Sequence, residues 1–147
     1  MNYWFPYLTI VITLCIVAFM PKHLTKREIY HTWWVLASIT VYTDLLFGDV
    51  LDLYDLGADG LQLLDLPVEA LLPPSIGIIY LNFLPKNKRR HVVYIMGWTV
   101  FSVVYEWLAI LCGFEKLKEW SLWYSALVYL LVFLFLRWHL YFIRSGR

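Results

Sequence analysis

Three carboxylic acids lie inside apolar stretches of this sequence, where a charged group is costly. Asp44, Glu69 and Glu106 belong to three different apolar segments, and no Lys or Arg lies at their depth. Placing a charged side chain at the centre of a bilayer costs ~3 kcal/mol on insertion scales, so such residues are the first candidates for function. Thr40 and Ser102 precede two of the acids by four residues, which puts hydroxyl and carboxyl on one helical face. We therefore predict a site that binds a proton, a cation or a cationic small molecule.

The same acids fit two other classes of protein. A protonated acid that hydrogen-bonds a hydroxyl can simply link helices, as in an accessory or assembly subunit that packs against another membrane protein. An intramembrane enzyme could use Glu69 or Glu106 as a general acid. The enzyme is the least favoured class, because the sequence has no nucleophile motif and no histidine pair at metal-ligand spacing. We expect no catalytic residue, no metal and no cofactor.

The composition indicates the solvent in which these acids lie. The chain has 147 residues, of which 61% are hydrophobic and only 16% are charged. Soluble domains are nearer 45–50% apolar and about 25% charged. Its mean hydropathy of +0.64 agrees with a membrane protein. A net charge of +1 gives no basic excess for binding nucleic acid, so the expected partners are the lipid bilayer and, in the second class, another membrane protein.

Five apolar segments are long enough to cross a membrane. Each approaches the ~20 residues that span the hydrocarbon as a helix. Lipid cannot satisfy free backbone groups, so every span must be helical. We therefore predict an all-α fold, a single transmembrane domain over 1–147 with spans at about 3–20, 29–47, 67–84, 92–113 and 122–141.

Basic residues are divided unequally between the connections. Ten of the twelve Lys and Arg follow the first or third span or lie at the end of the fifth, and the other two, Lys116 and Lys118, lie between the fourth and fifth. The positive-inside rule then places the N-terminus outside and the C-terminus in the cytoplasm. Only an odd number of spans preserves this alternation, which supports five.

The connection 48–66 is long, has no basic residue and carries five aspartates. Asp49, Asp52, Asp55 and Asp59 recur at intervals of three or four residues between leucines, which is typical of a helix with one polar side. We predict a short amphipathic helix here, lying on the outer surface.

Short motifs along most of the chain resemble an uncharacterised family of small multi-pass membrane proteins of Bacillus-type spore-forming bacteria. In the second half they are Tyr105-Glu106-Trp107, Gly113-Phe114, Trp120-Ser121-Leu122-Trp123-Tyr124-Ser125 and Arg137. In the first half they are Leu24-Thr25-Lys26-Arg27-Glu28-Ile29-Tyr30, Asp52-Leu53-Tyr54-Asp55-Leu56-Gly57 and Leu81-Asn82-Phe83-Leu84-Pro85. The resemblance implies a multi-pass protein of the bacterial cytoplasmic membrane, and it carries no activity and no site residue.

A second resemblance concerns one motif. Pro67-Val68-Glu69 is similar to the Pro-x-Glu motif of the small membrane-embedded carotenoid cyclase domains, in which carboxylates protonate a polyene. The motif occurs once, and Ala70 stands where that family usually has a second acid. This departure weakens the enzyme interpretation further.

The charge division generates a test of orientation. In a chain whose Cys15 and Cys112 are replaced by serine, we expect a cysteine at Ala58 to react with an impermeant maleimide from outside intact cells. A cysteine at Asn87 should react only after the membrane is opened. Labelling of position 87 in intact cells would show that the predicted orientation is wrong.

Overall fold

The computed structural model describes residues 2–59 and 62–146, and within them the chain forms five α-helices. The expected all-α fold is therefore confirmed, and each helix overlaps one predicted segment. The helices are α1 (Trp4–Phe19), α2 (Lys26–Asp44), α3 (Asp65–Asn82), α4 (Lys88–Leu111) and α5 (Leu122–Ser145).

Three of the helices begin where a polar side chain can satisfy free backbone N–H groups. Thr25 and Glu28 form a reciprocal capping box before α2, which fixes its start three residues earlier than predicted. Asn87 accepts from the N–H of Arg89 at the start of α4, and Ser121 accepts from Trp123 at the start of α5.

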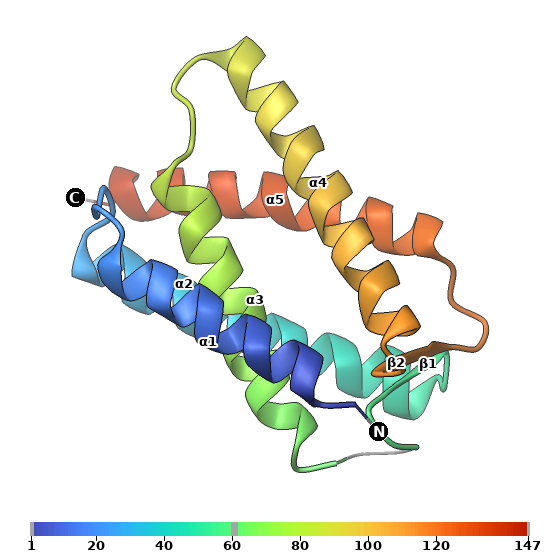
Figure 1. Cartoon of the computed structure of the whole chain (residues 1–147). Helices are drawn as coiled ribbons and strands as arrows, with labels where there is room; N and C mark the ends of the chain where they lie inside the picture. The colour runs from blue at the N-terminus through green and yellow to red at the C-terminus, as the bar shows by residue number, and fades with distance from the viewer. Residues whose placement is uncertain (1, 60–61, 147) are drawn as a thin grey trace.

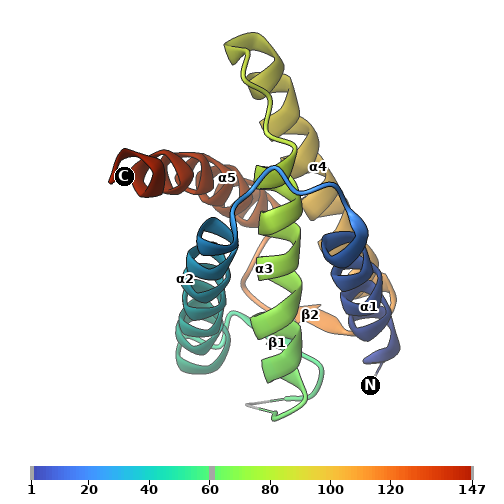
Figure 2. The same cartoon turned by 90° about the vertical axis from the view of Figure 1, so that its left-hand side faces the viewer.

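The helix α3 lies at the centre of the fold. It contacts α1, α2 and α5, and Figure 2 shows it between α1 and α2. α4 packs on α5, and the two helices cross rather than run side by side (Figures 1 and 2). A Cβ on Gly77 would overlap Cδ1 of Leu36 and lie 3.4 Å from Cδ1 of Leu136. Glycine therefore allows α3 to approach both α2 and α5 closely.

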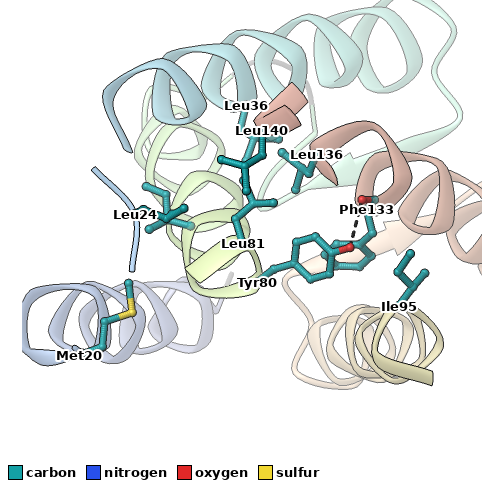
Figure 3. Close-up of a cluster of buried hydrophobic side chains, with 10 residues drawn as sticks. Met20, Leu24, Leu36, Tyr80, Leu81, Ile95, Phe133, Leu136 and Leu140 are labelled. Atoms are coloured by element: carbon teal, nitrogen blue, oxygen red, sulfur yellow. Dashed lines mark hydrogen bonds between the residues drawn. The ribbon is translucent and has the colours of Figure 1, made fainter. Parts of the chain in front are cut away.

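A hydrophobic core joins these helices in the half of the fold remote from the strands. Figure 3 shows Leu36, Leu136 and Leu140 meeting Tyr80 and Phe133. Tyr80 is fully buried, and its hydroxyl donates to the backbone carbonyl of Phe133 at 3.2 Å. Because the hydroxyl has this partner, its burial does not leave an unsatisfied polar group.

One end of the fold carries most of the basic residues. There the side chain of Asn82 accepts from the N–H of His23 at 2.8 Å and donates to the carbonyl of Pro21 at 2.9 Å. Arg144 at the end of α5 pairs at 3.0 Å with Glu28, which is almost fully buried at the start of α2. These contacts tie the α1–α2 connection to α3, and α2 to α5.

The opposite end is closed by two short strands, β1 (Tyr54–Leu56) and β2 (Glu115–Leu117). They pair antiparallel, with Asp55 opposite Lys116. Lys118 bridges to both Asp52 and Asp55, and the N–H of Gly57 donates to the carbonyl of Phe114 at 2.6 Å. We call this pair of strands with its flanking contacts the β cap.

The predicted amphipathic helix in the connection 48–66 is wrong. After α2 the chain makes a π-helical turn, η1 (Leu45–Val50), and then enters β1. Pairing with β2 supplies backbone hydrogen bonds that a short isolated helix in water would have to make alone. Residues 60 and 61 of this connection lie outside the described part.

Two helices of the described residues, α4 and α5, are long and apolar enough to cross a bilayer. α1 is apolar but shorter. Two such helices indicate a membrane protein only weakly, so five crossings remain a prediction.

A pair of glycines tests how the β cap is held. Both Gly57 and Gly113 have positive φ, at 64° and 74°. A Cβ on Gly57 would also overlap the hydroxyl of Tyr3, which donates to Asp65 at 2.8 Å, whereas a Cβ on Gly113 meets only Asn2 at 3.6 Å. We expect Gly57→Ala to cost about 3 kcal/mol and Gly113→Ala about 1–2 kcal/mol, measured by denaturant titration. An equal loss of stability in the two variants would mean that the contact with Tyr3 contributes nothing to the difference between them.

Candidate functional site

A cavity of about 300 Å³ lies under the β cap and is lined by residues of α2, α3, α4 and α5. All five residues predicted for the site from the sequence line it: Asp44, Glu69, Glu106, Thr40 and Ser102. They come from three helices that the sequence alone could not place side by side. A fourth acid, Glu115 of β2, also lines the cavity and was missed.

Glu106 is held by hydrogen-bond donors on both oxygens. It is 5% exposed, and Ser125 donates to its Oε1 at 2.5 Å while Tyr129 donates to its Oε2 at 2.7 Å. The indole N–H of Trp120 donates in turn to Ser125 at 2.7 Å. Donors directed at both oxygens replace hydrogen bonds to water that the carboxyl loses on burial. Ser125 and Tyr129 of α5 therefore act as fixed partners of Glu106.

Asp44 and Glu69 form a second acidic group. Their carboxyls approach each other between α2 and α3, and the hydroxyl of Tyr54 approaches Asp44. The side chain of Asp44 also lies against Gly48, where an added Cβ would be 3.1 Å from Oδ1. Burial and the charge of Asp44 raise the pKa of the Tyr54 hydroxyl, so Tyr54 stays protonated and is a donor to Asp44.

Glu115 faces the cavity because of its place in β2. Within that strand Glu115 and Leu117 are half-buried and Lys116 is exposed, which is the alternation of a strand with one covered side. Burial, followed by the charges of Glu106 and Asp44, raises the pKa of Glu115 well above its ordinary range. A run of three residues is too short for this alternation to be recognised in the sequence.

The hydroxyls of Thr40 and Ser102 do not donate to the acids one turn away. Thr40 donates to the carbonyl of Leu36 at 2.8 Å, and Ser102 donates to the carbonyl of Trp98 at 2.9 Å. Each hydroxyl oxygen keeps its lone pairs for the cavity. The polar groups that these two positions offer a ligand are therefore acceptors.

The far end of the cavity is apolar. It reaches Leu36, Gly77 and Leu136, where α3 approaches its neighbours. Glu69 and Gly77 are eight residues apart on α3, which corresponds to ~12 Å along the helix. The cavity thus has an acidic end near the β cap and an apolar end near the core.

No basic side chain lines the cavity among the described residues. Nor does the structure, over 2–59 and 62–146, bring three His, Cys, Asp or Glu side chains into an arrangement that could hold a metal ion.

Comparison of the chain with protein-family models, curated proteins and solved structures finds no match. The chemistry of the cavity is therefore the basis for assigning a function.

The raised pKa of Glu115 predicts the pH dependence of stability. The folded state holds its proton at a pH where the unfolded chain has lost it, so this residue lowers stability as pH rises above its ordinary pKa. We expect Glu115→Gln to raise the Tm in detergent at pH 8 and to have less effect at pH 5. Glu119→Gln, on an exposed neighbour, is the control. A Glu115→Gln effect that is the same at both pH values would contradict the assignment.

Proposed function

We propose that this chain is a small multi-pass protein of the bacterial cytoplasmic membrane that binds a cationic small molecule in the cavity under the β cap. The observation that carries the proposal is four carboxyl groups around one cavity that no described basic side chain lines. Like charges in a low-dielectric site cannot all remain ionised, so the site must hold protons or attract a cation.

The exposed surface supports a place in the membrane. Large apolar side chains point outward from α1, α4 and α5, where a soluble protein would present polar groups. On α5 they include Leu127, Leu131, Leu134, Trp138 and Phe142. With five crossings, the β cap would lie outside and the basic end in the cytoplasm, as the positive-inside rule predicts.

The acidic connection supports entry from the side of the β cap. A small polar chamber of about 10 Å³ lies beside the main cavity and shares Asp44, Tyr54 and Leu56 with it. Asp49 and Asp65 also line this chamber. Negative charge at the mouth of a site raises the local concentration of cations. These acids would attract a cation toward the Asp44 edge of the main cavity.

Binding of a compact organic cation tests the proposal. For protein in lipid nanodiscs, we expect phenethylammonium to bind more tightly than the neutral phenylethanol. Glu69→Gln should weaken phenethylammonium binding about tenfold or more, because a charge-assisted hydrogen bond is worth about 1.5–3 kcal/mol. Glu106→Gln should weaken it less, because Ser125 and Tyr129 already donate to that carboxyl. Asp59→Asn, on an exposed residue of the outer connection, should change the affinity little.

Two results would contradict the proposal. One is equal binding of the cation and the alcohol, and the other is unchanged affinity in both Gln variants. The carboxyls would then be structural links between helices, and an accessory or assembly subunit would become the favoured class of protein.

A further inference from the structure

In the described part of the chain, the buried side chain of Glu69 pairs with another acid and not with a base. Glu69 is only 4% exposed and lines the cavity. Over 2–59 and 62–146 no basic side chain pairs with it, and the side chain that reaches it is another carboxyl, that of Asp44. Glu106, by contrast, already has Ser125 and Tyr129. The unfilled position in the cavity is therefore at the Asp44–Glu69 end.

The helices that line the cavity offer further acceptors. Pro73 lies one turn beyond Glu69 on α3 and has no N–H, so the backbone carbonyl of Glu69 lacks its usual helical donor. The oxygens of Thr40 and Ser102 remain acceptors, because their protons go to the backbone. A ligand head group that satisfies these atoms must bring several donors and a positive charge.

The rest of the cavity wall favours an apolar body. Leu72 and Ile76 of α3 line the cavity, as do Val128 and Val132 of α5. At about 300 Å³ the space is at the small end of the range for ligand cavities. An unbranched chain suits a cavity of this volume whose lining extends ~12 Å from Glu69 to Gly77 along α3.

We propose that the ligand is an amphiphilic primary ammonium ion, with its –NH₃⁺ group between Asp44 and Glu69 and its unbranched apolar tail directed toward Gly77. This inference rests on the proposed function and names the class of ligand for the same site. The three N–H donors of the head group match the surplus of acceptors, and the tail displaces water from the apolar end.

A quaternary ammonium ion is the competing head group. Phe47 and Tyr54 flank Trp120 at the β cap, with ring centroids 5.6 and 5.9 Å from it, and aromatic faces attract such ions. These rings pack against one another, however, and a quaternary head group would leave the carboxyl and carbonyl acceptors without donors. The primary ammonium is therefore favoured.

A series of four ligands tests the contributions of the head group and of the tail to the affinity separately. The affinities of octylammonium, octyltrimethylammonium, octanol and butylammonium are measured with protein in phosphatidylcholine nanodiscs, and empty nanodiscs correct for partitioning into lipid. We expect octylammonium to bind at least tenfold more tightly than each of the other three. Glu69→Gln should remove most of the difference between octylammonium and octanol.

A matched pair of glycine variants locates the tail. In Gly77→Ala the new Cβ displaces the flexible end of Leu36, which lines the apolar end, whereas a Cβ on Gly97 of α4 has nothing within 4 Å. We expect Gly77→Ala to weaken octylammonium binding about tenfold and to leave butylammonium binding unchanged. Gly97→Ala should change neither. If Gly77→Ala does not fold, the ligand series on the unaltered chain still decides the question.

Each contrary result has a distinct meaning. Equal affinity for octyltrimethylammonium overturns the primary head group, and equal affinity for butylammonium overturns the tail, while a cation-binding function stands in both cases. Octanol binding as tightly as octylammonium, with no effect of Glu69→Gln, overturns this inference and the proposed function together.

Discussion

A carboxyl group leaves water at a large cost unless donors or a countercharge replace the water that it loses. Four acids face this requirement around one cavity, and the fold meets it unequally. Glu106 is satisfied by two hydroxyls of α5, whereas Glu69 meets chiefly another acid. The difference between Glu106 and Glu69 depends on how α2, α3 and the β cap are placed around the cavity. Each of these elements contributes an acid or an aromatic ring to the acidic end.

The two ends of the fold are held by different kinds of contact. At the basic end, single side chains such as Asn82 and Glu28 join neighbouring helices. At the acidic end, backbone pairing between β1 and β2 joins two connections and covers the cavity. Between them Gly77 brings three helices together and closes the apolar side. The apolar end of the cavity is thus formed by packed helices, and its acidic end is covered by a separate pair of strands.

The sequence predicts much of the helical content but little of how the helices meet. Long apolar segments identify all five helices, since burial or lipid favours helix along the whole segment. The spacing of Thr40 with Asp44, and of Ser102 with Glu106, correctly selects residues that line one cavity. Glu115, Ser125 and Tyr129 could not be found in this way, because their roles depend on pairing across long stretches of chain. The helix predicted near Asp55 fails for the same reason, since β2 determines the conformation there.

The pairing of β1 with β2 also has a consequence for how the protein is made. The ribosome completes β1 before α3 and α4, and β2 follows them. The cover therefore cannot close until nearly the whole chain has been synthesised, and for that interval Asp44 and Glu69 stand at an open end. While this end is open, water can reach the two carboxyls. Their desolvation cost therefore arises only when α4 and α5 are in place.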